Sequence, residues 1–146
     1  MARHVYRCPL RWSDMDAYQH VNNTVFLRYL EEARIDFMFT VADSGGVEFR
    51  SGMVVARHEI DYRRPLVHRA EPVLVETWVE KISAASVRLG YEVKDAEEDG
   101  GVVYVAAASV LVPYDLEEKR PRRFSPEERE YLLKFQDDAP AAGAAA

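Results

Sequence analysis

The sequence contains a single cysteine, Cys8, among its 146 residues. One cysteine cannot form an intrachain disulfide or a thiolate cage around a metal, and no cluster of other ligand residues has metal-binding spacing. The chain also lacks a basic segment followed by an apolar one at its start, the pattern of a secretory signal. We therefore expect a cytoplasmic protein that binds no metal.

Long hydrophobic runs and an excess of positive charge are also absent. The most apolar stretch, residues 24–42, contains five charged side chains, so we expect no membrane-spanning helix. Acidic residues outnumber basic ones by 25 to 19, and the resulting net charge of −6 argues against general binding to nucleic acid or to anionic membranes. An anionic ligand would therefore need a local cluster of basic side chains.

Hydrophobic periodicity predicts one long helix followed by several strands. Apolar residues recur at steps of three and four over residues 23–42, with Asn22 or Asn23 as N-cap and Ser44-Gly45-Gly46 as the stop. Alternation of period two predicts strands over Val5–Trp12, Met53–Arg64, residues 73–79, Val87–Lys94 and Val102–Tyr114. The last two strands are joined by an acidic turn and form a hairpin. Ser125 and Pro126 open a short helix that ends near Gln136.

This order of elements indicates an α+β fold. We expect an antiparallel sheet of about five strands, wrapped around the long helix, and a short C-terminal helix. A single domain is expected over residues 1–136, and the low-complexity residues 137–146 are expected to form a disordered tail. The open edges of such a sheet can pair with a second copy, so we expect a homo-oligomer, either a dimer or a dimer of dimers.

The loop between the first strand and the long helix concentrates polar groups. Within ten residues it holds two carboxylates, an imidazole and two carboxamides, namely Asp14, Asp16, His20, Asn22 and Asn23. The free N–H groups of a helix start point outward at this place. Such a loop either caps the helix with its Asp and Asn side chains or holds the groups that a reaction needs.

Four segments carry a family resemblance. They are Arg11-Trp12-Ser13-Asp14-Met15-Asp16, His20-Val21-Asn22-Asn23, Tyr29-Leu30-Glu31-Glu32-Ala33-Arg34 and Glu59-Ile60-Asp61-Tyr62-Arg63-Arg64-Pro65-Leu66. Together they resemble the acyl-CoA thioesterases of the hot-dog fold, in the 4-hydroxybenzoyl-CoA thioesterase branch, over about residues 5–130. One departure is Gln19, because the family commonly has glycine at that position.

The resemblance implies hydrolysis of an acyl- or aroyl-CoA thioester to a carboxylate and free CoA. It implies no separate cofactor, since coenzyme A is part of the substrate. The family's catalytic acid maps onto Asp16, as nucleophile or general base, and its oxyanion donor onto the backbone N–H of Asn23. His20 either orients water or the thioester, or bonds the loop backbone. Asp14 is expected to cap the loop or to pair with an arginine.

Substrate contacts are expected from the same segments. The resemblance implies that Val21 and Asn22 contact the substrate, and basic side chains must hold the phosphates of coenzyme A. The basic candidates are Arg63 and Arg64, with Arg57 and the run Lys119–Arg123 as further ones.

Three alternatives stay open. Another hot-dog branch uses a glutamate of the long helix as its catalytic group, so Glu31 or Glu32 is a rival to Asp16, unless they form solvated or dimer-facing ion pairs with Arg28 or Arg34. A non-catalytic acyl-CoA-binding protein of the same fold would lack the loop acid or carry a DNA-binding segment. The fold alone does not fix the function, so a hot-dog dehydratase or hydratase is the third alternative. Such an enzyme would carry different motifs from those found here.

Overall fold

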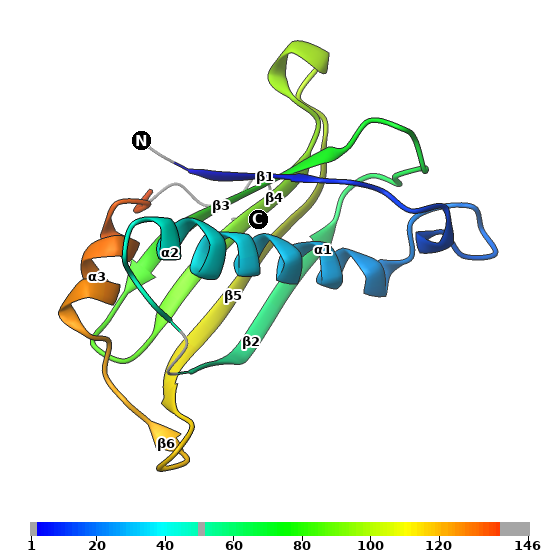
Figure 1. The fold of residues 1–146 in the computed structure, drawn as a ribbon. Helices are drawn as coiled ribbons and strands as arrows, with labels where there is room; N and C mark the ends of the chain where they lie inside the picture. The colour runs from blue at the N-terminus through cyan, green and yellow to red at the C-terminus, as the bar shows by residue number, and fades with distance from the viewer. Residues whose placement is uncertain (1–2, 50–51, 138–146) are drawn as a thin grey trace.

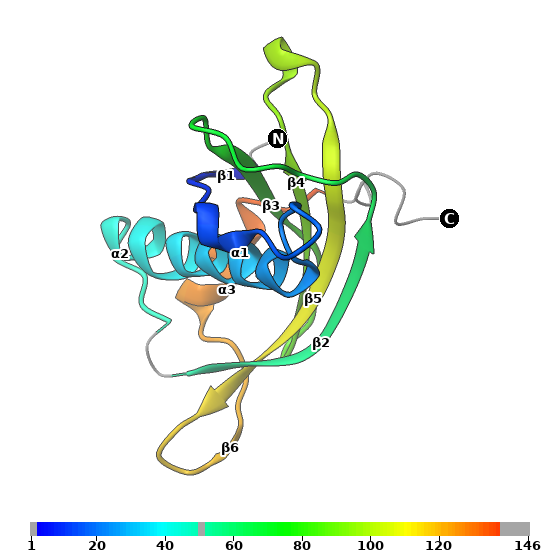
Figure 2. The same cartoon turned by 90° about the vertical axis from the view of Figure 1, so that its right-hand side faces the viewer.

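The computed structural model describes residues 3–49 and 52–137 (Figure 1). A curled antiparallel sheet holds its strands in the order β1-β3-β4-β5-β2, with β6 paired to β5. The strands are β1 His4–Cys8, β2 Met53–Tyr62, β3 Val73–Ile82, β4 Val87–Lys94, β5 Val103–Asp115 and β6 Arg120–Pro121. The long helix lies in the concave side of this sheet, as Figure 2 shows. The predicted α+β architecture is confirmed.

The long helix is made of three consecutive segments. They are α1 Asn23–Ile35, the π-helical turn η2 Asp36–Val41 and α2 Ala42–Ser44. Asn22 is the N-cap, as predicted, and its side chain accepts a hydrogen bond from the amide of Thr24 at 2.8 Å. The π-helical turn was not predicted, and the hydroxyl of Tyr131 donates to the carbonyl of Phe37 within it.

The predicted hairpin of β4 and β5 is confirmed, and it forms the middle of the sheet. Tyr91 of β4 lies opposite Ala107 of β5 and faces the helix with the main core. On the other face, Trp78 is fully buried and packs against Ala106. A Cβ atom at Gly90 would lie 2.6 Å from the Trp78 ring. The small residues therefore make room for a tryptophan of the neighbouring strand.

The first strand is shorter than predicted. It ends at Cys8 instead of Trp12, because Pro9 has no N–H to continue the ladder. The chain then makes a short 3₁₀ turn, η1 Trp12–Asp14, in which the Trp12 side chain is 73% exposed. At the other edge of the sheet, β5 is the one strand of the described residues that pairs with β2, and most of the side chains of β2 are exposed.

The C-terminal helix α3 spans Pro126–Leu133 and begins with a capping box between Ser125 and Glu128. Asp137, the first residue of the expected tail, is ordered and pairs with Arg3 at 2.9 Å. The rest of that expectation falls on residues 138–146, which lie outside the described residues. Within the described ranges, no helix is long and apolar enough to cross a membrane.

Candidate active site

Asp14 anchors the loop that precedes the long helix. Its carboxylate is 4% exposed and accepts hydrogen bonds from the hydroxyl of Tyr29 at 2.7 Å and from the amide of Arg11 at 3.0 Å. Burial, followed by the hydrogen bond to Asp14, raises the pKa of Tyr29 above its ordinary value, so the phenol remains a donor. Asp14 therefore has the capping role that the sequence predicted.

Asp16 is held in one orientation by two donors. One carboxylate oxygen accepts from the side-chain amide of Asn22 at 2.9 Å, and the other accepts from the backbone N–H of Tyr18 at 2.9 Å. The backbone closes a turn around it, because the Asp16 N–H donates to the carbonyl of His20 and the Gln19 N–H donates to the carbonyl of Asp16. The carboxylate is half-buried and keeps lone pairs for a further partner.

Gln19 adopts a left-handed backbone conformation, with a φ angle of 62°. This conformation costs a residue with a Cβ atom about 1–2 kcal/mol, whereas glycine adopts it freely. The backbone conformation at this position therefore favours glycine, the residue that the family commonly has there. In this chain glutamine adopts that conformation.

Asn22 connects the catalytic candidate to the start of the helix. While its amide nitrogen donates to Asp16, its oxygen accepts from the backbone N–H and the hydroxyl of Thr24, at 2.8 and 2.7 Å. The next amide, that of Val25, donates to the carbonyl of Asn22. Among the described residues, no hydrogen bond uses the N–H of Asn23. That N–H lies at the positive end of the helix and is free to bind an oxyanion.

A small cavity of about 280 Å³ opens at this helix start. It is lined by His20, Val21, Asn23, Phe26, Tyr62, Arg63, Arg64 and Pro65. Five predicted site residues thus lie together, while Asp16 and Asn22 lie outside its lining. The sequence did not identify the other three lining residues, Phe26, Tyr62 and Pro65, as part of a site. The Tyr62 hydroxyl donates to the Asn23 carbonyl at 3.0 Å. Its position in the segment Glu59–Leu66, which carries the family resemblance, is the feature of the sequence that could have identified it.

Some of the basic side chains proposed to bind phosphate already form ion pairs within the chain, and others do not. Arg57 forms an ion pair with Glu59 at 2.9 Å, and Arg122 pairs with Glu128 at 2.8 Å. The run Lys119–Arg123 lies around β6, at the opposite end of the molecule from the loop that precedes the long helix (Figure 1). Arg63 and Arg64 line the small cavity and are exposed, and their side chains have no ion-pair partner in the described part of the chain.

The helix glutamates form no ion pair with the arginines of their own helix. Within the ranges that the structure describes, neither Glu31 nor Glu32 lies within ion-pair distance of Arg28 or Arg34, so a pair of this kind stays a prediction for a dimer. Both glutamates are exposed, and Glu31 lines a different, larger cavity than the one at the helix start. No three side chains of His, Cys, Asp and Glu in the described residues gather into a group able to hold a metal ion.

The family model described as the thioesterase-like superfamily matches residues 10–132. The chain belongs to this superfamily, and the prediction of a thioester hydrolase with the hot-dog fold is confirmed.

Particular relatives support the same family. The chain is 31% identical over 128 residues to the long-chain acyl-CoA thioesterase FadM of Escherichia coli strain K12, which covers 84% of this chain and 92% of that protein. A putative acyl-CoA thioesterase of Xanthomonas campestris is 35% identical, with a TM-score of 0.66 over 79% of this chain and 96% of that one. A thioesterase of Thermus thermophilus, solved in complex with coenzyme A and zinc, is 29% identical, with a TM-score of 0.69 over 90% and 92% of the two chains.

Proposed function

We propose that the protein hydrolyses an acyl- or aroyl-CoA thioester to a carboxylate and free CoA. The observation that carries this proposal is the link through Asn22, which holds the carboxylate of Asp16 beside a helix start whose Asn23 N–H has no hydrogen-bond partner among the described residues. Two exposed arginines, Arg63 and Arg64, line the cavity at the same place. The names of the Escherichia coli and Xanthomonas relatives and the coenzyme A complex of the Thermus relative support this substrate class.

The chemistry assigns one task to each group. Asp16 either attacks the thioester carbonyl and displaces CoA as its thiolate, giving a mixed anhydride that water then hydrolyses to the carboxylate, or removes a proton from a water that attacks the carbonyl and displaces the same thiolate. The negative charge that develops on the carbonyl oxygen is stabilised by the N–H of Asn23 and the helix dipole. His20, exposed at the edge of the cavity, orients water or the thioester, and Val21 and Asn22 contact the substrate. The reaction needs no separate cofactor, and the proposed location is cytoplasmic.

The experiment that tests this function is thiol release from a panel of acyl-CoA and aroyl-CoA thioesters, followed with a chromogenic thiol reagent. We expect at least one member to yield free CoA and its carboxylate in equal amounts, with many turnovers per chain. A non-catalytic binding protein would bind the same thioesters without releasing thiol. A dehydratase or hydratase would change the absorbance of an enoyl or hydroxyacyl substrate and leave the thioester intact.

Charge removal at the small cavity is expected to weaken substrate binding. Because Arg63 and Arg64 hold phosphates in the ground state and the transition state alike, their replacement by glutamine should raise KM about tenfold and leave kcat nearly unchanged. Arg57→Gln is the matched control, since Arg57 is already paired with Glu59. A KM within twofold of wild type in the double variant would show that the phosphates lie elsewhere.

The exposed edge strand β2 supports a homodimer, alone or as half of a dimer of dimers. It carries ten residues, Met53–Tyr62, and pairs with β5 on one side only. A strand with a free row of N–H and C=O groups is satisfied by the same strand of a second copy. Light scattering during size exclusion at micromolar concentration should therefore detect no folded species near 16.7 kDa. A stable folded monomer would contradict this assembly.

A further inference from the structure

The long helix contains a buried hydroxyl, that of Tyr29, which takes no part in the proposed reaction but contacts the loop that holds Asp16. Tyr29 is 4% exposed and lies two helical turns beyond Asn22, on the same face of α1. Its hydroxyl donates to the carboxylate of Asp14 at 2.7 Å. Asp14 is also 4% exposed, and the backbone N–H of Arg11 is its second donor, at 3.0 Å. A buried carboxylate that is held by neutral donors depends on each of them.

The bond between Tyr29 and Asp14 completes the attachment of the loop to the helix. The backbone carbonyl of Asp14 accepts from the backbone N–H of Asn22 at 3.0 Å, so these two residues face each other at the base of the loop. Asn22 belongs to the helix start as its N-cap, and its side chain holds Asp16. Asp14 has no such link along the chain, because the loop itself separates it from the helix. Its bond to Tyr29 therefore fixes the second end of the loop to the helix.

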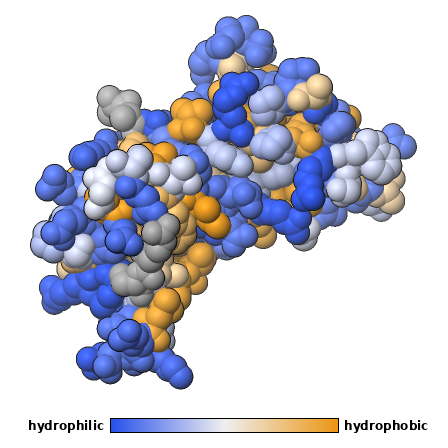
Figure 3. Space-filling model, viewed as in Figure 1, coloured by the Kyte–Doolittle hydropathy of each residue, from blue (hydrophilic) through white to orange (hydrophobic). Residues whose placement is uncertain are grey.

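Hydrophobic burial does little to fix the outer part of this loop. The loop protrudes beside the start of α1 (Figure 1), and the surface at that end of the molecule is mainly hydrophilic (Figure 3). Two large side chains of this segment, Trp12 and Tyr18, are 73% and 83% exposed. The hydrogen bonds at the base of the loop therefore determine where Asp16 lies.

We propose that Tyr29 is a positioning residue for the reaction, acting through Asp14 and Asn22 on the carboxylate of Asp16. The inference rests on the proposed function and adds to it a group that does not line the cavity at the helix start. Burial and the bond to Asp14 raise the pKa of Tyr29, so the phenol keeps its proton and acts as a donor. A displacement of a reacting group by about 1 Å can cost on the order of 10² in rate, so a small movement of the loop is enough to slow the reaction.

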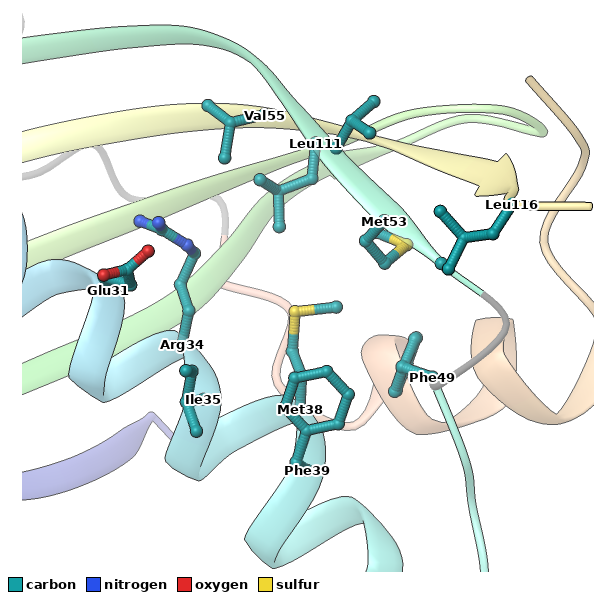
Figure 4. Close-up of a pocket in the computed structure, with 12 residues that line it drawn as sticks. Glu31, Arg34, Ile35, Met38, Phe39, Phe49, Met53, Val55, Leu111 and Leu116 are labelled. Atoms are coloured by element: carbon teal, nitrogen blue, oxygen red, sulfur yellow. The ribbon is translucent and has the colours of Figure 1, made fainter. Parts of the chain in front are cut away.

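Glu31, one of the two rivals of Asp16, lies apart from this pair. Glu31 and Arg34 line a second cavity, of about 620 Å³, between the long helix and the strands β2 and β5 (Figure 4). Tyr29 does not line this cavity, and its hydroxyl contacts the loop instead. A loss of activity on removal of the Tyr29 hydroxyl therefore reports on the loop and not on Glu31.

The test compares two tyrosine-to-phenylalanine variants of the full chain. Tyr29→Phe removes the hydroxyl that holds Asp14. Tyr131→Phe is the matched control, because it removes a buried hydroxyl that donates to the carbonyl of Phe37, near the other end of the long helix. Each variant loses one buried hydrogen bond, so each should lower the melting temperature by about 5 °C. Only Tyr29→Phe should also lower kcat, by about tenfold or more, with KM within about twofold of wild type.

Variants of Asp14 test the same contact from its other side, even if Tyr29→Phe does not fold. Both donors bond to one oxygen of Asp14, Oδ2, so Asp14→Asn can keep them by presenting its amide oxygen there. Asp14→Asn should therefore keep kcat within about threefold of wild type, whereas Asp14→Ala should lower it by about tenfold or more. Adding Tyr29→Phe to Asp14→Ala should cause no further loss, because both substitutions break the same contact.

Hydrogen exchange at the Asn22 backbone amide gives a readout that does not depend on activity. Because this N–H donates to Asp14, its protection should fall at least tenfold in Tyr29→Phe and stay within about threefold of wild type in Tyr131→Phe. A wild type that releases no thiol would refute the proposed function, and the exchange rates would still show whether Tyr29 holds the loop.

The inference is overturned if Tyr29→Phe keeps kcat within about twofold of wild type, or if Tyr131→Phe loses as much kcat as Tyr29→Phe. Either result would show that the Tyr29 hydroxyl only stabilises the fold. If Tyr29→Phe does not fold, an Asp14→Ala variant with the kcat of wild type overturns the inference in the same way.

Discussion

Replacing Asp16 with asparagine is expected to lower kcat by a factor on the order of 10² or more. The substitution keeps the shape of the side chain but removes its negative charge and its ability to attack or to accept a proton. Because Asp16 is half-buried in a surface loop and makes its contacts through hydrogen bonds that asparagine can partly replace, KM and the melting temperature should change little. Steady-state thiol release and thermal unfolding, measured on the same preparation, separate these effects.

An activity within threefold of wild type in a folded Asp16→Asn variant would contradict the assignment. The matched control is Asp61→Asn, which removes an exposed carboxylate from β2 outside the small cavity. This control should keep its kcat, so that a loss seen in both variants would indicate a general effect of charge.

The second large effect is expected at Asn22, where one side chain both caps the helix and orients Asp16. Aspartate is as good an N-cap as asparagine, so Asn22→Asp should keep the cap on the helix start. It removes the 2.9 Å donor to Asp16, however, and brings a second carboxylate to its place. The loss of a hydrogen bond to a charged group, worth about 1.5–3 kcal/mol, corresponds to a decrease of about 10- to 100-fold in kcat.

Asn22→Ala serves as the comparison for this variant. It loses the cap as well as the donor, so it should lower the free energy of unfolding by about 1 kcal/mol in addition to lowering kcat. Chemical denaturation and thiol release on the three proteins give both quantities. A kcat for Asn22→Asp within twofold of wild type would show that the contact with Asp16 is not used in the reaction.

The elements that sequence predicted well are those that local pattern controls. The cap at Asn22, the helical repeat after it, and the alternation of β4 and β5 each follow from neighbouring residues. The end of β1 shows the limit of such patterns, because alternation continued to Trp12 while the missing N–H of Pro9 ended the ladder at Cys8.

Other features depend on contacts between distant parts of the chain. The π-helical turn is supported by the Tyr131 hydroxyl, which comes from α3 and lies 94 residues away from Phe37 in sequence. Likewise, Trp78 of β3 packs against Ala106 of β5, and only the arrangement of the strands in the sheet establishes this contact. Local periodicity carries no information on either contact.

The candidate site also contains both kinds of feature, those that neighbouring residues determine and those that depend on distant parts of the chain. The motif residues from Asp14 to Asn23 are contiguous, so their proximity could be predicted. Tyr62 reaches the carbonyl of Asn23 from a separate strand, β2, and only the fold establishes this contact. The spacing of Arg34 from Glu31 suits an ion pair on the helix, but among the described residues no carboxylate lies within ion-pair distance of Arg34.

The most direct test of whether the catalytic acid lies in the loop is the turnover number at saturating acyl-CoA. It is measured for Asp16→Asn and for the helix variants Glu31→Gln and Glu32→Gln. We expect Asp16→Asn to lose on the order of 10² or more in kcat, while both helix variants remain within about threefold of wild type. The opposite result, an active Asp16→Asn and a folded but inactive Glu31→Gln or Glu32→Gln, would move the catalytic acid from the loop to the helix.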